Sequence, residues 1–155
     1  MKSLVVFYSR TGTTKKVGEA IGKALECNIE EIIDTANRKW LFGWLRSGRD
    51  AMRKKLTVIH PIKLNPAEVD IVIIGTPNWG NLLAPAIRTY IEQNKASFKK
   101  VAFFCTAGGS NCENVFKELE LLCGKSPVGV LGIRQKEAKA NEITDKINQF
   151  IAKLS

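Results

Sequence analysis

A run of hydroxyl side chains near the start of the chain has the composition of a phosphate-binding loop. It lies between an apolar run and an amphipathic stretch, and it holds four hydroxyl residues, one arginine and one glycine: Ser9, Arg10, Thr11, Gly12, Thr13 and Thr14. The glycine permits a tight turn, and a helix that begins here presents free N–H groups to an anion. The segment therefore predicts a site for a phosphate dianion. The structural alternative is that Thr13 or Thr14 only caps the helix.

Better known phosphate loops do not fit this segment. The Gly-x-Gly-x-x-Gly fingerprint needs three glycines, and only Gly12 is present. A Walker loop needs Gly-Lys-Ser or Gly-Lys-Thr, which is also missing.

Two later segments also carry residues suited to a ligand. One sets an indole among turn-forming residues, and the other is small and rich in glycine; they are Thr76, Pro77, Asn78, Trp79, Gly80 and Asn81, and Thr106, Ala107, Gly108, Gly109, Ser110 and Asn111. An indole on a polar loop suits a flat ligand, and a glycine-rich backbone allows close approach with free N–H groups. Taken singly, each segment could be an ordinary surface tryptophan or a flexible turn.

The cysteines and the single histidine argue against metal chemistry. Cys27, Cys105, Cys112 and Cys123 form no Cys-x-x-Cys pair, and His60 stands alone. Zinc and iron–sulfur sites therefore have no spacing to support them. Buried, reduced thiols are the expected state, and the alternative is that Cys105 and Cys112, which flank the third loop, are redox partners.

The elements that must position these loops follow from the apolar patterning. Four runs are short, continuous and rich in β-branched or aromatic residues, as in strands buried on both faces: Ser3–Tyr8, Val69–Ile74, Lys100–Cys105 and Val128–Ile133. The weaker run Asn28–Ile33 predicts an edge strand. Amphipathic stretches predict helices over Thr14–Leu25, Ala84–Asn94, Asn114–Leu122 and Asn141–Leu154.

This alternation indicates a doubly wound α/β/α sandwich with a five-stranded parallel sheet. In such folds ligands bind beyond the carboxyl ends of the strands, so the three segments are expected at one edge of the sheet.

Length and composition favour one soluble domain over residues 1–155. The chain has 155 residues, of which 45% are hydrophobic and 25% charged. No run approaches the roughly 20 apolar residues that span a bilayer, and Leu4–Tyr8 is too short for a signal-peptide core. We expect a cytoplasmic location.

The net charge of +9 is concentrated in a basic amphipathic insert at about residues 37–57. Seven cations stand there against Asp50 alone: Arg38, Lys39, Arg46, Arg49, Arg53, Lys54 and Lys55. They are interleaved with Trp40, Phe42 and Trp44. A solvated face over an apolar stripe, a docking site for an acidic partner, and a surface for nucleic acid or membrane are the open interpretations.

The three loops together resemble those of the flavodoxin family. Ser9–Thr14 is similar to the family's Thr/Ser-x-Thr-Gly-x-Thr phosphate loop, Gly75–Gly80 resembles the loop whose aromatic residue stacks on the flavin, and Phe104–Gly109 resembles the third loop. The resemblance implies strand order 2-1-3-4-5, the short variant of the fold and FMN as cofactor.

The resemblance also implies a role for each loop. Ser9, Arg10, Thr11, Gly12, Thr13 and Thr14 would hold the phosphate; Thr76, Pro77, Asn78, Trp79 and Gly80 would cover one flavin face and its N5 edge; Thr106, Ala107, Gly108 and Gly109 would approach the pyrimidine edge. The third loop departs from the family pattern in lacking an aromatic residue, and acidic residues are missing from all three loops.

An FMN-dependent electron carrier between redox partners is the expected function, with no catalytic side chain. Acidic, ferredoxin-like proteins are candidate partners for the basic insert. An NAD(P)H- or quinone-linked FMN oxidoreductase of the same fold is the alternative, and a nucleic-acid or membrane-surface module is a more distant one. Because carboxylates are scarce near the flavin, we expect its fully reduced form to be less destabilised than in acidic relatives.

Overall fold

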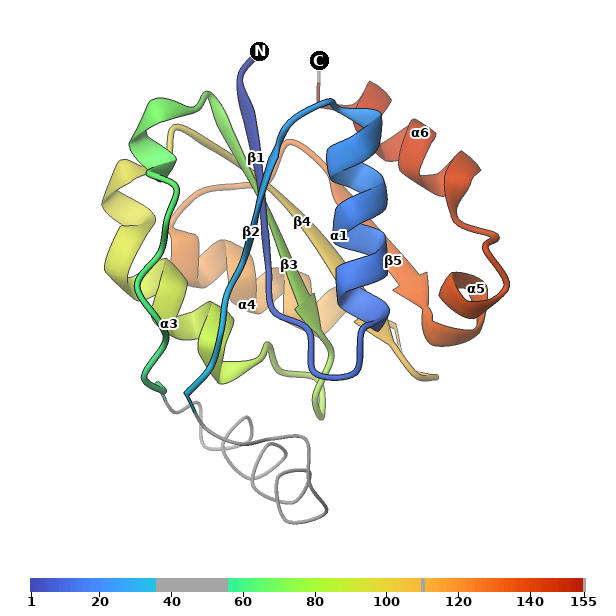
Figure 1. Ribbon diagram of the computed structural model, residues 1–155. Coiled ribbons are helices and arrows are strands. Elements are labelled where there is room, and N and C mark those ends of the chain that lie inside the picture. Colours follow the sequence, from blue (N-terminus) through green and yellow to red (C-terminus); the bar gives the residue numbers. More distant parts are fainter. Residues whose placement is uncertain (36–55, 110, 155) are drawn as a thin grey trace.

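A five-stranded parallel sheet forms the centre of the computed structural model, which describes residues 1–35, 56–109 and 111–154 (Figure 1). The strand order is β2-β1-β3-β4-β5, as predicted. The strands are β1 (Ser3–Phe7), β2 (Asn28–Glu31), β3 (Ile71–Pro77), β4 (Lys100–Ala107) and β5 (Val130–Arg134).

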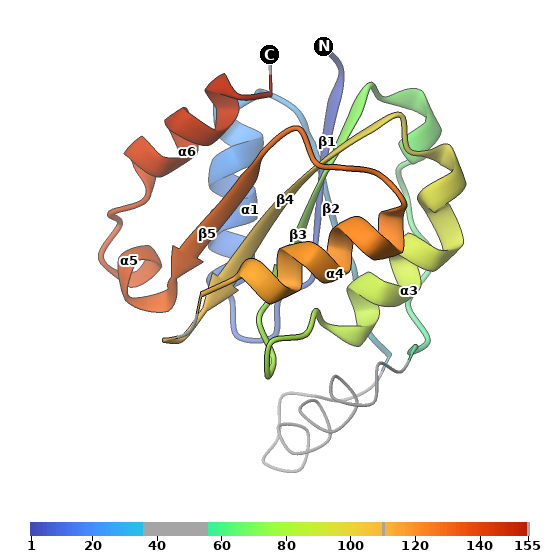
Figure 2. The same ribbon diagram turned by 180° about the vertical axis from the view of Figure 1, so that it is seen from behind.

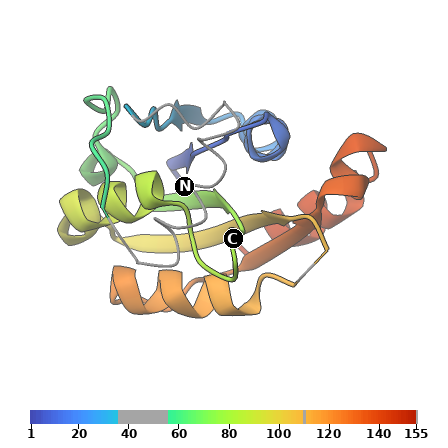
Figure 3. The ribbon, with the colours of Figure 1, turned by 90° about the horizontal axis from the view of Figure 1, so that it is seen from below.

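Helices cover both faces of the sheet in three layers (Figures 2 and 3). One face carries α1 (Thr13–Ala24), α5 (Gln135–Lys139) and α6 (Thr144–Ala152), and the other carries α3 (Pro85–Asn94) and α4 (Glu113–Cys123). Two short 3₁₀ turns, Pro66–Glu68 and Lys95–Ser97, precede β3 and β4. The predicted doubly wound α/β/α architecture is therefore confirmed.

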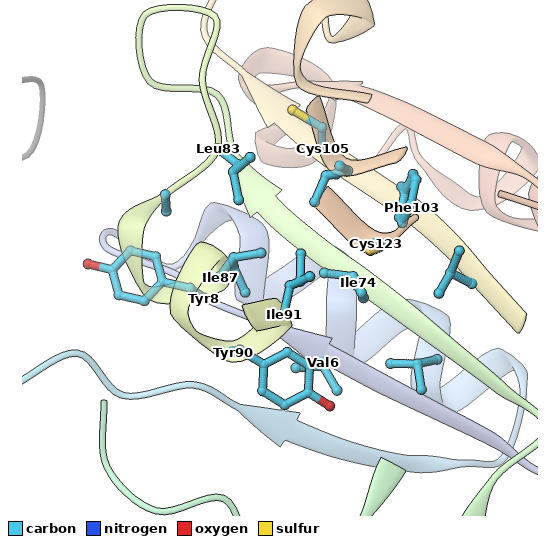
Figure 4. Packing of buried hydrophobic residues seen from close by; sticks show 14 of the residues in the cluster. Val6, Tyr8, Ile74, Leu83, Ile87, Tyr90, Ile91, Phe103, Cys105 and Cys123 are labelled. Carbon is cyan, nitrogen blue, oxygen red and sulfur yellow. The ribbon is translucent and has the colours of Figure 1, made fainter. Parts of the chain in front are cut away.

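Successive residues of each inner strand pack into opposite apolar layers. Leu4 and Val6 face α3 and α4, whereas Val5 and Phe7 face α1 and α6. Figure 4 shows the α3–α4 layer, in which Ile87 and other residues of α3 pack against the sheet. This two-sided burial explains why the inner strands are continuously apolar in sequence.

The strands at the two edges differ. Asn28–Ile33 was expected at an edge, and β2 lies there. The expectation that Val128–Ile133 is buried on both faces is wrong. β5 is the opposite edge strand, and it alternates between buried Leu131 and Ile133 and exposed Val130. Because α6 covers only one of its faces, the outward side chains meet water.

The C-terminal helix that was expected over Asn141–Leu154 is present as α6 and begins later than expected, at Thr144. Asn141 has a left-handed backbone with φ 59°, which a continuous α-helix does not accept. The short helix α5, which precedes this turn, was not predicted. The predicted apolar stripe survives, because Ile143, Ile147 and Leu154 are buried.

Residues 36–55, which hold nearly all of the basic insert, lie outside the described residues, so the predictions made for that insert remain predictions. The assignment of residues 1–155 to a single domain also remains a prediction. Within the described part of the chain, no helix is both long and apolar enough to cross a bilayer.

Candidate functional site

The loops that follow β1, β3 and β4 meet at the carboxyl edge of the sheet. These three strands are neighbours and parallel, so their loops emerge side by side. The Thr14 and Thr106 hydroxyls are hydrogen-bonded at 2.7 Å, which joins the first loop to the third. The Asn78 N–H donates to the Thr106 carbonyl at 2.8 Å, which joins the second loop to the third. We call this edge the three-loop site.

The first loop presents a helix N-terminus. Gly12 occupies the N-cap position with φ 99°, and no side chain caps α1. The structure thus differs from the alternative in which Thr13 or Thr14 is the cap. The Gly12 N–H donates to Ser9 Oγ at 3.1 Å. The N–H groups of Thr13, Thr14 and Lys15 have no hydrogen-bond partner among the described residues, which is the donor set that an anion requires.

The four hydroxyls of this loop are not equivalent. Thr11 is exposed, Ser9 and Thr13 are half-buried, and Thr14 is buried. Thr14 is already bonded to Thr106, so it links the loops as well as lining the first one. Only one of the two hydroxyls donates its hydrogen in this contact. The hydrogen of the accepting hydroxyl therefore remains available to a ligand.

A tight hairpin holds Trp79 in the second loop. Gly80 and Asn81 both have left-handed backbones, with φ 61° and 66°, as a two-residue turn of type I′ requires. Trp79 and Leu82 exchange N–H···O=C bonds of 3.0 and 3.2 Å across it. The Asn78 side chain accepts from the Asn81 N–H at 2.8 Å and donates to the Asn111 carbonyl at 2.9 Å. The indole is therefore carried on a fixed support.

Two neighbours orient the Trp79 ring. The Tyr8 ring lies edge-on to it, with centroids 5.6 Å apart and planes at 87°. The Arg10 guanidinium carbon lies 5.5 Å from the indole centroid, a cation–π contact. Arg10 therefore lies beside the indole, although sequence reasoning grouped it with the phosphate. That reasoning missed Tyr8, whose signal was its place as the last residue of the first apolar run.

Thr76 holds together the elements that support the site. Its side chain is fully buried, and its hydroxyl donates to the Pro77 carbonyl and accepts from the Ala84 N–H, both at 2.9 Å. Ala84 is the N-cap residue of α3, so Thr76 fixes the end of β3 to the start of that helix. This geometry makes Thr76 a positioning residue in the structure. The predicted contact of Thr76 and Pro77 with a cofactor remains a prediction.

The third loop leaves open space at the site. Gly108 and Gly109 are exposed, and a methyl group built on either would meet nothing within 4 Å. Thr106 and Ala107 are buried behind them. Ser110 lies outside the described residues. An open glycine backbone beside a half-buried indole and a helix N-terminus suits a ligand with a flat ring system and a phosphate.

Two thiols lie directly behind the third loop. Cys105 and Cys112 are both buried. The neighbouring Cys112 thiol and burial raise the pKa of the Cys105 thiol far above its usual range. The neighbouring Cys105 thiol lowers the pKa of Cys112. Among the described residues, no group of three His, Cys, Asp or Glu side chains is arranged to hold a metal ion.

Comparison with known proteins points to one family. A family model described as flavodoxin matches residues 2–129. A protein from Bacteroides uniformis assigned as a flavoprotein superposes with a TM-score of 0.74 at 27% identity, over 91% of this chain and 97% of the other. No curated protein sequence matches the chain.

Two more distant structures share the fold. A flavoprotein from Lactobacillus acidophilus in complex with FMN has a TM-score of 0.72 at 22% identity, over 91% of this chain and 97% of the other. An NADPH-quinone reductase from P. pentosaceus has a TM-score of 0.58 at 9% identity, over 99% of this chain and 95% of the other.

Proposed function

The chain belongs to the flavodoxin family, and we propose that it binds FMN at the three-loop site and transfers electrons between redox partners. One observation carries the proposal. Three features lie together on hydrogen-bonded loops: a helix N-terminus whose N–H groups have no partner among the described residues, an indole on a fixed hairpin, and an open glycine segment. These are complementary to the phosphate, the ring face and the ring edge of FMN.

The first loop would hold the phosphate. The N–H groups of Thr13, Thr14 and Lys15 point from the start of α1, where the helix dipole favours negative charge. The hydroxyls of Ser9 and Thr11 can add donors. The left-handed backbone at Gly12 lets the chain turn into the helix and exposes these N–H groups.

The second and third loops would hold the ring system. The Trp79 indole offers an aromatic face, and Tyr8 together with the hairpin keeps it from rotating freely. The backbone at Gly108 and Gly109 has room for close approach and can offer N–H groups to the ring edge. Asn78 ties the two loops together, so a ligand that touches both is held in one geometry.

Bound FMN supplies one- and two-electron transfer chemistry. The chain then has to bind the cofactor, orient it and set its potential. No side chain needs to act as acid, base or nucleophile, because electron transfer depends on distance and potential. Arg10 is the charged side chain of the three loops, and it lies beside the indole. It would favour a negatively charged reduced ring.

The absorption spectrum of the purified chain tests the proposal. We expect a flavin spectrum, and FMN rather than FAD after the protein is denatured. A colourless preparation should regain the spectrum when FMN is added. A chain that carries no flavin and takes up none from FMN would refute the proposal.

An FMN oxidoreductase that uses NAD(P)H or a quinone directly is the second candidate. The open space at Gly108 and Gly109 favours it, since a second reactant needs access to the flavin. Stopped-flow mixing separates the two functions. A carrier is reduced by NADPH or NADH only when a partner reductase is present, whereas an oxidoreductase is reduced without one and is reoxidised rapidly by quinone.

We also propose that the cations of the basic insert dock an acidic redox partner. The proposal rests on the seven Arg and Lys residues between 38 and 55. Replacing Arg46, Arg49 and Arg53 by Glu should slow reduction by an acidic donor such as a ferredoxin and should remove its salt dependence. The control is Lys99→Glu with Lys100→Glu, because these exposed lysines lie at the amino end of β4, far from the three-loop site at its carboxyl end.

Equal, salt-independent rates for the parent chain and the insert variant would refute docking. Binding of the parent chain, but not of that variant, to duplex DNA or to anionic vesicles would instead support the nucleic-acid or membrane interpretation. A cytoplasmic location remains part of the proposal.

A further inference from the structure

Cys105 and Cys112 lie at the two ends of the third loop. Cys105 is in β4, and Cys112 is the residue immediately before α4. Both thiols are free, and both belong to the apolar layer between the sheet and the helices α3 and α4 (Figure 4, which labels Cys105). Their exposed fractions are 0% and 6%, so Cys112 is the one nearer to solvent.

The strand register brings the two side chains together. Cys105 pairs with Gly132 of β5, and residues paired in this way direct their side chains to the same face of a sheet. A Cβ on Gly132 would lie 3.9 Å from both the Cβ and the Sγ of Cys112. Cys112 thus fills the space that glycine leaves open beside Cys105. The Cys105 Sγ donates to the Thr106 carbonyl at 3.8 Å, which ties this thiol to the start of the third loop.

The environments of the two thiols suit them to different roles, Cys112 as the first nucleophile and Cys105 as the second thiol. The neighbouring Cys105 thiol lowers the pKa of Cys112, which favours the Cys112 thiolate. The neighbouring Cys112 thiol and burial raise the pKa of Cys105. In thiol–disulfide exchange the thiolate is the attacking species, so the more accessible Cys112 is suited to react first.

We propose that Cys105 and Cys112 form a reversible dithiol–disulfide pair, oxidised by a low-molecular-weight disulfide, that closes the third loop covalently. The Cys112 thiolate attacks one sulfur of the small disulfide, whose S–S bond breaks and releases one small thiol. Cys105 then attacks the Cys112 sulfur of the mixed disulfide and displaces the second small thiol. The protein loses two electrons to the small disulfide, and the two cysteine protons end on the two released thiols.

The disulfide would change the three-loop site. A covalent bond draws the two sulfur atoms closer than a non-bonded contact allows, so the ends of the loop move together. Thr106 follows Cys105 directly and is hydrogen-bonded to both Thr14 and Asn78. Its displacement would disturb all three loops. We therefore expect oxidation to weaken FMN binding several-fold, an expectation that rests on the function proposed above.

Oxidised glutathione is the probe for the disulfide itself. After incubation with it, the full chain is denatured, its remaining thiols are alkylated, and its peptides are mapped by mass spectrometry. We expect a cross-link between Cys105 and Cys112 that dithiothreitol reverses, with Cys27 and Cys123 alkylated. Cys27→Ser should behave like the parent chain. Cys105→Ala should trap the mixed disulfide on Cys112.

Two results of this mapping would overturn the proposal. One is that Cys105 and Cys112 both remain reduced in the parent chain at a glutathione ratio that oxidises an exposed dithiol. The other is that glutathione stays attached to Cys112 in the parent chain, because the second step would then not occur.

Titration with FMN before and after oxidation tests the effect on the site. The parent chain should bind FMN several-fold more weakly when oxidised, and Cys112→Ser should be insensitive to oxidised glutathione. If the cross-link forms and the affinity is unchanged, the proposed effect on the loop is wrong. If the reduced chain binds no FMN while the cross-link forms, the proposed function fails and the dithiol pair stands.

Discussion

Thr14 and Thr106 lie 92 positions apart in the chain, and their hydroxyl oxygens are hydrogen-bonded at 2.7 Å in a buried contact. Thr14 is in the first turn of α1, and Thr106 is near the end of β4. The Thr106 carbonyl also accepts the Asn78 N–H. Thr106 is therefore the residue through which the three loops of the site are held in a common geometry.

Replacing either threonine by valine should destabilise the chain by about 1–2 kcal/mol, because the hydroxyl that remains loses its partner inside the protein. The double variant should cost less than the sum of the single variants, because two apolar groups of the same shape leave no polar atom unpaired. Urea unfolding measures all three free energies.

Thr11→Val is the control for this pair. Thr11 is exposed, and its hydroxyl makes no hydrogen bond within the described residues, so the free energy of unfolding should hardly change. Strict additivity of the Thr14 and Thr106 variants would show that the two hydroxyls do not depend on each other.

The fold could be predicted because burial on both faces leaves a clear pattern. The run from Leu4 to Phe7 is apolar throughout since its residues enter two different core layers, and the parallel order then sets the loops of β1, β3 and β4 at one edge. Patterning failed where burial is one-sided, as at Val130, and where a left-handed backbone keeps a residue out of a predicted helix, as at Asn141.

The contacts within the site could not be predicted in the same way. Hydroxyl residues at 9–14 indicate an anion site from their types alone. That Thr14 reaches Thr106 and that Arg10 lies beside Trp79 depends on side-chain directions across loops distant in sequence. No local propensity encodes such directions, so the structure was needed to separate residues that could touch a ligand from those that hold the loops, such as Thr76.

Gly12 and Gly109 should respond differently to a methyl group. Gly12 has φ 99°, so Gly12→Ala should cost roughly 1–2 kcal/mol of stability through backbone strain and should also weaken FMN binding. Gly109 has no positive φ and open space around it, so Gly109→Ala should leave stability unchanged. If the flavin uses that space, Gly109→Ala should lower FMN affinity alone.

Thermal unfolding of the FMN-free variants and FMN titration separate these two effects. Equal stability of Gly12→Ala and Gly109→Ala would contradict the strain argument. Unchanged FMN affinity in Gly109→Ala would place the ring edge elsewhere.

Trp79→Ala should weaken FMN binding by about 1–3 kcal/mol, the usual value of stacking on an aromatic side chain. Trp79→Phe keeps an aromatic face and should recover most of the affinity. Because Trp79 is half-buried and its loop is held by backbone bonds, the stability of the chain should change less than the affinity. Quenching of flavin fluorescence during titration measures the affinity, and an alanine variant that binds like the parent chain would rule out stacking on this indole.

Glu137 links α5 to α6 and should make stability depend on pH. Its carboxylate accepts from Lys146 Nζ at 2.7 Å and from the Arg134 N–H at 2.8 Å, and these bonds lower the pKa of Glu137. A carboxyl whose pKa is lower in the folded chain stabilises it at neutral pH and loses that effect as the pH falls through the lowered value.

Glu137→Gln should therefore be less stable than the parent chain at neutral pH, by less than about 1 kcal/mol because the pair is partly exposed. The difference should shrink at an acid pH at which the parent carboxyl is protonated. Urea unfolding at both pH values measures it. A difference that does not vary with pH would mean that the carboxylate charge contributes nothing.

Arg10 should raise the reduction potential of bound FMN. Its guanidinium lies 5.5 Å from the Trp79 centroid, beside the proposed ring site, and the loops themselves supply no acidic side chain to offset it. A cation beside the flavin would favour the negatively charged, fully reduced ring. Arg10→Gln should make that couple more negative, on the order of tens of millivolts for about 1 kcal/mol of lost attraction.

Arg10→Lys is the matched control, because it keeps the charge and loses the planar group over the indole. In a spectroscopic redox titration it should stay close to the parent potential, and the gap to Arg10→Gln should narrow at high salt. If Gln and Lys variants shifted the potential equally, the effect of Arg10 would come from its packing on Trp79. Equal potentials in all three proteins would mean that the cation does not act on the flavin. A strongly negative potential for the fully reduced couple of the parent chain would contradict the expected effect of the missing carboxylates.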